Sequence, residues 1–466
     1  MKLLHKWVIG IVASAVVTAP GYAAVSAQEA EQLGKNLTEF GAEKAGNADG
    51  SIPAYTGGLK SVPGYTSGAD RYINPFKDEK PLYTIDAKNL AQYESLVTEG
   101  NKALIKKYPE TYHLDVYPSH RTVWYPQWSL ENTAKNATTA RLAGSVEGDS
   151  MSGAAPDGLP FQGVPFPIPK NGYEVMWNFK LHVSPAVIHR MASAWLVDTS
   201  GGVTGLPTTN EWYLQPWWEQ DGKLRAKTFD ATLGFSAQLQ SPPSSAGITF
   251  LNYYLPTAAD EGQKVWFYTP GQRRVRRAPE FAYDIPIAAY GGVIFWDEVT
   301  GFVGRLDRFD FKLVGKKEMI IPYNTIDVVN TTTPRKALGT HHVDPGAMRW
   351  EKHRVWVVEA TRKPDARHAY KLRRFYIDED SWCLVSTEDY DDASNLWRVT
   401  NENTFPTYDI GGLDNISWGT NDLIKGNYFL INVGAADSGF YARSYASSEG
   451  LNIALTPDAV VASGVR

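Results

Sequence analysis

The sequence predicts a mainly β (α+β) protein whose strands form a curved antiparallel sheet. From about Leu181 onward, short runs of β-branched and aromatic residues alternate with turn residues, which is typical of antiparallel strands. Four successive runs, joined by short polar turns, predict a meander at Val355–Val358, Tyr370–Ile377, Trp382–Thr387 and Leu396–Val399. Long neighbouring strands favour a deeply curved sheet.

Further runs of the same kind precede the meander. They predict strands at Val203–Leu206, Trp212–Trp218, Ile248–Leu255, Val265–Tyr268, Val293–Trp296 and Phe309–Val314. The stretch from Val265 to Arg277 predicts a hairpin, because Pro270 and Gly271 suit the central positions of a type II turn, which needs φ > 0 at Gly271. An apolar arm of this hairpin therefore pairs with a basic one.

The N-terminal third predicts a less regular structure that packs on the sheet. Residues 41–76 are crowded with Gly, Pro, Asn and Asp, so this segment should wrap over a neighbouring surface as extended chain and turns. Apolar periodicity predicts a helix from Asp86 to Lys107 and a weaker, peripheral one from Leu130 to Leu142, and residues 145–169 suit a linker. We therefore expect three parts, which are residues 1–27, 28–170 and 171–466.

The first part has the features of a secretory signal peptide. Lys2 precedes the apolar stretch Trp7–Ala19, and small residues follow, so cleavage is expected after Ala23 or Ala27. A single membrane helix is the alternative, although the apolar stretch is shorter than the ~20 residues that span a bilayer. No cysteine near the leader could carry a lipid. We expect an exported, soluble, periplasmic protein that is not a lipoprotein.

Composition excludes other classes. With 43% hydrophobic and 21% charged residues, the chain can bury a large core and is not disordered as a whole. Its net charge of −5 provides no positive field for nucleic acid, so no nucleic-acid partner is expected. Cys383 is the only cysteine, so an intramolecular disulfide is impossible, and its apolar neighbours predict a small core residue.

Few patterns indicate an enzyme. The sequence lacks the Gly-x-Ser-x-Gly, His-Glu-x-x-His, P-loop and Gly-x-Gly-x-x-Gly motifs, although a site built from distant residues stays open. The best metal candidate is His341-His342-Val343-Asp344 with His353 and His368 near it; a loop is the alternative, because neighbours on a strand face opposite ways. Two acidic clusters should be solvated hairpin turns: Asp378, Glu379 and Asp380, and Glu388, Asp389, Asp391 and Asp392. We expect neither catalytic residues nor a metal or cofactor.

The basic arm of the hairpin contains Arg273, Arg274, Arg276 and Arg277. On a strand, Arg274 and Arg276 share one face while Arg273 and Arg277 share the other, so both faces cannot be buried. One interpretation is a solvated edge strand, and the other is a rim that contacts an anionic headgroup or an acidic partner surface through bidentate guanidinium bonds. The 15 tryptophans leave open a sugar-binding surface or an ordinary β core.

Three motifs resemble a known family. They are Gly41–Gly50 with Ile52-Pro53 and Thr56-Gly57-Gly58, then His353–Ala360, and then Arg367–Tyr370 with Phe375–Trp382. Through these motifs nearly the whole chain after the leader resembles the proteobacterial domain-of-unknown-function family 1329. More weakly, mainly over residues 260–400 and in the pattern Trp266-x-Tyr268-x-Pro270, it is similar to outer-membrane-lipoprotein sorting carriers of the LolA and LolB type.

The resemblance implies a half-open antiparallel β-barrel with a few helices, whose apolar hollow holds acyl chains. It implies a periplasmic carrier of a hydrophobic or lipid-like molecule, and in such a hollow we expect Trp266, Tyr268, Trp356 and Trp382 to bind the ligand. It also suggests as partners a resistance-nodulation-division-type transporter and an outer-membrane barrel, because such proteins are often encoded beside them. An exported enzyme acting on a hydrophobic or polymeric substrate and a carbohydrate-binding envelope component are the alternatives.

Overall fold

The computed structural model of the protein describes residues 25–144, 146–255, 262–278, 283–433 and 441–464. Strands hold far more of these residues than helices do, so the predicted mainly β fold with few helices is confirmed. The strands form one sheet of eleven, one of seven and a two-stranded ribbon. The predicted signal peptide lies outside the described residues except for positions 25–27.

The larger sheet is built around a meander. Its successive antiparallel strands are β13 (Phe309–Pro322), β14 (Trp350–Arg362), β15 (Leu372–Asp378), β16 (Leu384–Tyr390), β17 (Leu396–Pro406) and β18 (Leu413–Asp422). β19 (Tyr428–Ile431), β6 (Ala194–Val197) and β7 (Val203–Gly205) continue it beyond β18. β2 (Leu114–Tyr117) runs parallel to the start of β14 and carries β1 (Tyr83–Ile85). The four runs that predicted the meander are confirmed as β14 to β17.

The smaller sheet is antiparallel throughout. Its order is β12 (Arg274–Arg277), β11 (Gln263–Thr269), β10 (Thr249–Tyr254), β9 (Leu233–Leu239), β8 (Thr209–Leu214), β5 (Val187–Ala192) and β20 (Tyr441–Tyr445). Successive side chains of these strands point to opposite faces, and most are at least partly buried on both. One face is directed toward the larger sheet, and the other packs under the C-terminal segment.

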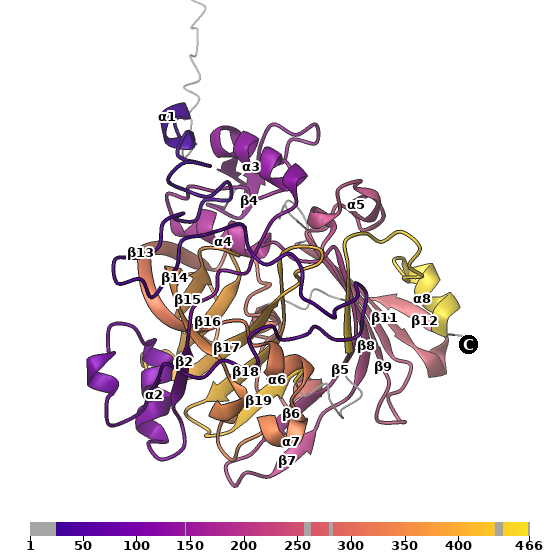
Figure 1. The fold of residues 1–466 in the computed structure, drawn as a ribbon. Coiled ribbons are helices and arrows are strands. Elements are labelled where there is room, and N and C mark those ends of the chain that lie inside the picture. The colour runs from indigo at the N-terminus through magenta and orange to yellow at the C-terminus, as the bar shows by residue number, and fades with distance from the viewer. Residues whose placement is uncertain (1–24, 145, 256–261, 279–282, 434–440, 465–466) are drawn as a thin grey trace, which may run out of the picture.

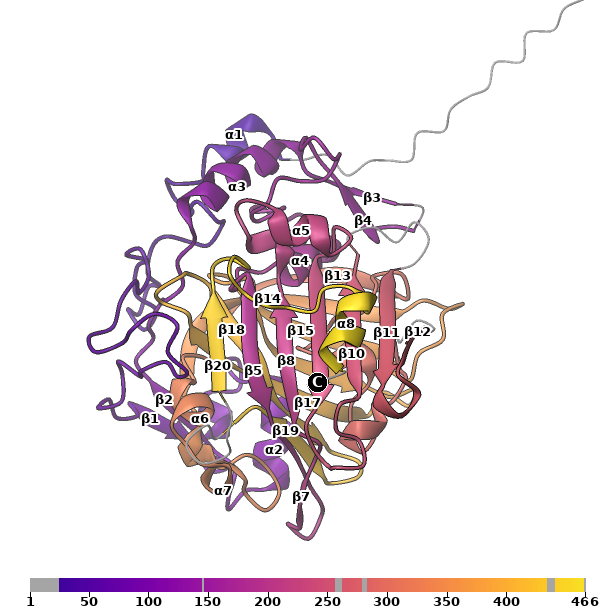
Figure 2. The same cartoon turned by 90° about the vertical axis from the view of Figure 1, so that its right-hand side faces the viewer.

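The two sheets are joined at a corner and stacked. β5 and β6 are separated by Ser193 alone but belong to different sheets, so the chain passes directly from one sheet to the other. Figure 2 shows the smaller sheet in front of the larger one, with α8 (Pro457–Gly464) on its outer face. The inner faces of the two sheets therefore enclose the space between them.

Helices are short and lie mostly around the sheets (Figure 1). They are α1 (Ala27–Ala30), α2 (Glu99–Lys107), α3 (Gln127–Thr139), α4 (Gly172–Lys180), α5 (Lys223–Lys227), α6 (Ile326–Asn330) and α7 (Pro334–Ala337), and β3 (Arg141–Ala143) pairs with β4 (Ser150–Ser152) beside α3. Between α1 and β1 the chain runs over the surface as extended backbone and turns. No helix of the described residues combines the length and the apolar character that crossing a bilayer requires.

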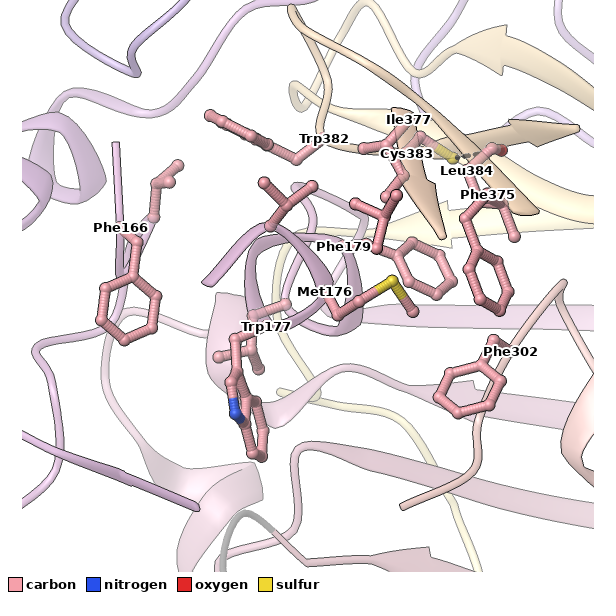
Figure 3. Packing of buried hydrophobic residues seen from close by; sticks show 14 of the residues in the cluster. Phe166, Met176, Trp177, Phe179, Phe302, Phe375, Ile377, Trp382, Cys383 and Leu384 are labelled. Atoms are coloured by element: carbon pink, nitrogen blue, oxygen red, sulfur yellow. Dashed lines mark hydrogen bonds between the residues drawn. The ribbon is translucent and has the colours of Figure 1, made fainter. Parts of the chain in front are cut away.

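The largest hydrophobic core lies between α4 and the larger sheet. In Figure 3, Met176 and Phe179 of α4 point toward Phe375 and Ile377 of β15. Cys383 is fully buried in this core, which confirms its prediction as a core residue. An apolar helix face on an apolar sheet face removes several large side chains from water at roughly 1.5–3 kcal/mol each.

The prediction of one long helix in the N-terminal third is wrong. The single helix expected from Asp86 to Lys107 is a 3₁₀ turn, η1 (Leu90–Gln92), followed by α2. The chain breaks because Thr98 has extended backbone and caps α2, accepting a hydrogen bond from the backbone N–H of Asn101. Periodicity alone could not show this new start, because apolar residues continue across the break.

The turn of the basic hairpin is also different from the prediction. Pro270–Gln272 forms a 3₁₀ turn, and the left-handed residue is Arg273 with φ of 47°, not Gly271.

The strand predicted at Val293–Trp296 is absent from the described fold. Only Phe295 makes a bridge, to Pro286, before the 3₁₀ turn η5 (Trp296–Glu298) begins. The predicted strand Trp212–Trp218 ends at Leu214, where Pro216 starts another 3₁₀ turn.

Candidate functional site

A cavity of about 410 Å³ lies between the smaller sheet and the residues that face it. Its floor is the inner face of β8 to β11, and its largest apolar side chains are Tyr213, Leu233, Phe235, Leu239, Phe250 and Phe267. Residues 285–299, which we call the roof segment, cover it together with Trp418 of β18. The volume is within the range of sites that bind a small hydrophobic molecule.

Strand alternation explains why the floor is apolar. On β9, Leu233, Phe235, Ala237 and Leu239 occur at every second position and all line the cavity. The aromatic rings of Phe250 and Phe267 face each other across β10 and β11 with their centroids 4.6 Å apart. Several floor residues are only partly buried, so the apolar surface continues toward solvent.

The roof segment is held by buried charges at its end. Asp297 accepts hydrogen bonds from His368 at 3.0 Å and from Arg373 at 2.9 Å. Burial disfavours the charge of Asp297, but Arg373 and His368 outweigh burial and hold its pKa below the usual range. The next residue, Glu298, accepts hydrogen bonds from Tyr370 and Arg398. Trp296, directly before this pair, lines the cavity.

The inner end of the cavity is polar and contains a buried ion pair. Glu211, which lines the cavity, is 2.6 Å from both Nε and Nη2 of Arg190. Arg190 also donates to the hydroxyl of Tyr213 at 2.8 Å and to the carbonyl of Ile416 at 2.6 Å. Opposite charges with further hydrogen bonds can remain ionised in the interior, so this end carries no net charge.

The aromatic residues predicted to bind a ligand lie elsewhere than this cavity. Trp266 and Tyr268 alternate with Phe267 on β11, so they point to the outer face of the sheet and pack in the cluster under α8. Trp356 stacks on Trp382 with centroids 5.9 Å apart, and the Trp382 indole donates to the carbonyl of Phe40. Trp382 belongs to the core of the larger sheet (Figure 3), and Trp356 packs against this core. Their role in binding stays a prediction.

The basic cluster lies on an edge strand. Arg273, Arg274, Arg276 and Arg277 are exposed, and β12 pairs only with β11 in the described sheet. Arg276 is opposite Phe267, so Arg274 and Arg276 are on the face of the sheet that lines the cavity. The structure therefore fits the solvated edge strand, and it also places two guanidinium groups on the same sheet face as the cavity.

The acidic clusters correct another prediction, because most of these side chains are buried rather than solvated. Asp378, Glu379, Asp380, Glu388 and Asp389 are each at most 2% exposed, whereas Asp391 and Asp392 lie in a turn at the surface. Cations explain the burial: Arg121 binds Asp380 through two hydrogen bonds of 2.6 and 2.8 Å, Arg373 binds Asp389 at 2.7 Å, and Arg374 binds Glu388 at 3.1 Å.

The histidines of the metal candidate are not brought together. His342 contacts the hydroxyl of Thr111 at 2.9 Å, His368 contacts Asp297, and Asp344 caps a 3₁₀ turn, as in the loop alternative. A different group, His353, Asp378 and Asp380, has potential ligand atoms within 4.8 Å of one another. Asp380 is already bound by Arg121, and burial raises the pKa of Asp378 to about 7, which weakens this group as a metal site.

Sequence reasoning missed the roof segment and the buried ion pairs. One signal for the ion pairs was available in the sequence. Arg373 precedes the β15–β16 turn by about as many residues as Asp389 follows it, and the same holds for Arg374 and Glu388. Residues placed in this way face each other across a hairpin, so complementary charges predict cross-strand pairs. No comparable signal marks residues 285–299, because irregular chain carries no periodicity.

The fold and the site define a β protein with an apolar cavity between two stacked sheets. The chain belongs to the family described as protein of unknown function (DUF1329), which covers residues 84–460. It is similar to the protein named Uncharacterized protein PA3922 of Pseudomonas aeruginosa (strain PAO1), with 35% identity over 473 residues that cover 100% of this chain and 99% of that protein. The family that the motifs resemble is therefore confirmed.

Solved structures show similarity as well. A domain from Vibrio parahaemolyticus described as outer membrane lipoprotein-sorting has 13% identity, covers 62% of this chain and 98% of its own, and gives a TM-score of 0.41. The LolA superfamily protein NE2245 from Nitrosomonas europaea has 9% identity, covers 57% of this chain and 92% of its own, and gives a TM-score of 0.33.

Proposed function

We propose that the protein is a carrier that binds a hydrophobic or lipid-like molecule in the cavity between its two sheets. The observation that carries this proposal is the cavity itself, whose floor and roof are almost entirely aliphatic and aromatic. Removing apolar surface from water contributes roughly 25 cal/mol per Å², or about 0.8 kcal/mol per methylene, so a chain-like ligand binds well without a charged contact. Such binding needs no catalytic group, and the ligand leaves unchanged.

The cavity lining includes solvent-exposed residues, which give the carrier an entrance for its ligand. Ile285, Ala288 and Ala289 of the roof segment are exposed and also line the cavity, while Ala237 and Tyr213 are buried. A ligand would enter beside the exposed residues and move toward the buried ones. In this proposal the stacked sheets act as the half-open barrel of a carrier.

The proposal extends to the cell envelope. An exported carrier would receive its ligand in the periplasm and deliver it to a second component, such as a resistance-nodulation-division-type transporter or an outer-membrane barrel. Arg274 and Arg276 are exposed on the cavity face of the edge strand, so an acidic surface of such a partner could dock there by charge complementarity.

The proposal is tested by finding the ligand and by blocking the entrance. Mass spectrometry of the gently purified protein should detect a bound amphiphile, and saturable changes in tryptophan fluorescence should follow its readdition, because Trp296 and Trp418 line the cavity. Ala289→Trp should obstruct the entrance and weaken binding at least tenfold. Ala393→Trp is the matched control, since Ala393 is equally exposed in the turn after β16.

Two results would contradict the carrier. If Ala289→Trp and Ala393→Trp bind added amphiphiles equally well, the cavity is not the binding site. If the ligand is recovered cleaved, the protein is an enzyme and the cavity is its substrate pocket.

A further inference from the structure

Two residues that line the apolar cavity each have a buried polar atom without a hydrogen-bond partner among the described residues. Trp418 of β18 and Asn252 of β10 come from the opposite sheets, both line the cavity, and they are 1% and 3% exposed. Among the described residues, neither the indole Nε1–H of Trp418 nor the Oδ1 of Asn252 has a hydrogen-bond partner.

Such atoms are costly unless something binds them. A buried donor or acceptor that has lost water and gained no partner destabilises the folded state. Proteins keep few of them, and those that line a binding cavity are satisfied by what enters it. One atom here donates and the other accepts, so a single group that does both would satisfy them.

The charges around the cavity favour an uncharged group. Among the described lining residues, Glu211 is the charged one, and Arg190 and the hydroxyl of Thr209 already occupy its oxygens. An ionised carboxylate would meet Glu211, and an ammonium would find Glu211 already neutralised by Arg190. Either ion would also lose its hydration with no free counter-charge among these residues, which is far more costly than burying a hydroxyl or an amide.

We propose, on the basis of the carrier function above, that the ligand is a long-chain molecule with an uncharged hydroxyl or amide group, which binds between Trp418 and Asn252. Trp418 donates to the oxygen of this group, and Asn252 accepts its hydrogen. The apolar chain then extends along β9 and β10 toward the exposed part of the roof segment. The group enters first and the chain follows.

The test compares compounds of equal, medium chain length on the full mature protein by calorimetry. A primary alcohol and a primary amide both donate and accept, an alkyl methyl ether accepts only, and a carboxylate and a trimethylammonium are charged. We expect the alcohol and the amide to bind about tenfold more tightly than the ether, which is the ratio for one hydrogen bond at the upper end of its net strength. The charged compounds should bind more weakly than the ether.

Two variants separate the two contacts. Trp418→Phe removes the donor and should weaken the alcohol and the ether alike. Asn252→Leu removes the acceptor and should weaken the alcohol about tenfold but leave the ether unchanged. Trp266→Phe is the control, because Trp266 is on the outer face of the smaller sheet, which also contains Asn252. If a variant fails to fold, the ratio of the affinities of the unmodified protein for the alcohol and the ether still tests whether the ligand donates a hydrogen bond.

The outcomes distinguish this inference from the carrier function. If all the uncharged compounds bind equally and neither variant changes their order, the two atoms bind water rather than ligand, and the inference fails while the carrier stands. If the carboxylate binds most tightly, the uncharged head is wrong. If no compound binds saturably to the unmodified protein, both proposals fail.

Discussion

Replacing Ala237 by phenylalanine would fill the middle of the cavity. Ala237 is in the centre of β9, is 2% exposed and lines the cavity. A methylene takes roughly the ~30 Å³ of a water molecule in the liquid, so about 410 Å³ holds roughly a dozen methylenes. A phenyl ring would occupy the space of about three to four of them. The substitution should therefore shorten the longest chain that the cavity accepts by about a quarter to a third.

The expected loss of affinity depends on chain length. At about 0.8 kcal/mol per methylene, a chain that fills the cavity should lose at most ~3 kcal/mol, and less because ordering the chain already opposes binding. A chain of half that length should lose little, since it fits in the remaining space. Calorimetry over a series of uncharged amphiphiles measures both the slope per methylene and the length at which affinity stops rising.

Stability provides an independent check of the same space. A ring that enters an empty apolar cavity should leave the free energy of unfolding unchanged or raise it by about 0.5–2 kcal/mol. Ala442→Phe is the matched control, because Ala442 is in β20 of the same sheet and 1% exposed in a packed core. At Ala442 the added ring should lower the free energy of unfolding by about 1–3 kcal/mol. The reasoning is refuted if both variants are destabilised alike, or if Ala237→Phe weakens short and long chains equally.

Two further outcomes are expected. Burial raises the pKa of Asp414 to about 6 from 3.8, so the folded state keeps a proton that the unfolded state releases, and stability falls as pH rises from about 4 to about 6. Asp414→Asn should therefore match the unmodified protein near pH 4 and be more stable by roughly 1–3 kcal/mol above pH 7 in urea titrations; an equal difference at both pH values would contradict this. Replacing Arg274 and Arg276 together by Glu should change the free energy of unfolding by no more than about 0.5 kcal/mol and weaken docking to an acidic partner. Unchanged transport in cells would leave this pair as a solvated edge.

The meander could be predicted because each of its strands carries its own signal. Trp356, Phe375 and Leu384 belong to runs of β-branched and aromatic residues between short polar turns, and such local patterns fix strand identity. The corner between β5 and β6 has no such signal. Pairing between distant strands depends on the whole fold, so the sequence predicted one curved sheet where the chain forms two.

The candidate site could be predicted only in kind. The prediction named Trp266 and Tyr268, which lie on the outer face of β11, whereas Phe267 between them lines the cavity. When both faces of a strand are buried, apolar and polar residues do not alternate along it. The sequence then does not show which side chains point to the inner face. Trp418 and Asn252 line the same cavity although they are far apart in the chain, which no local pattern shows.

Buried charge was underestimated for a physical reason. A carboxylate near a turn is usually solvated, and a single sequence does not show that cations are available on neighbouring strands. Arg373 contacts Asp389 across the hairpin and also Asp297 of the roof segment. One guanidinium thus connects the larger sheet to the roof segment, so we expect this ion pair to affect ligand exchange.

Arg373→Met should loosen the roof segment. The substitution leaves the carboxylates of Asp297 and Asp389 buried without this cation, a change that typically costs about 3–5 kcal/mol. Because Asp297 directly follows Trp296, the loss should be concentrated where the cavity is covered. We expect faster hydrogen exchange of amides in residues 287–296, and faster release of bound amphiphile, than in the unmodified protein.

Arg374→Met is the control for this prediction. Arg374 is the next residue on β15, is partly exposed, and pairs with Glu359 and Glu388 rather than with the roof segment. Glu388 also accepts hydrogen bonds from the backbone of Gly100 and from the hydroxyls of Tyr376 and Tyr390, so it keeps partners when Arg374 is removed. Exchange in residues 287–296 should therefore stay slow in this variant. If both variants release ligand at the same rate, or if Arg373→Met speeds exchange equally in every strand, the ion pair stabilises the fold as a whole and does not control the cover of the cavity.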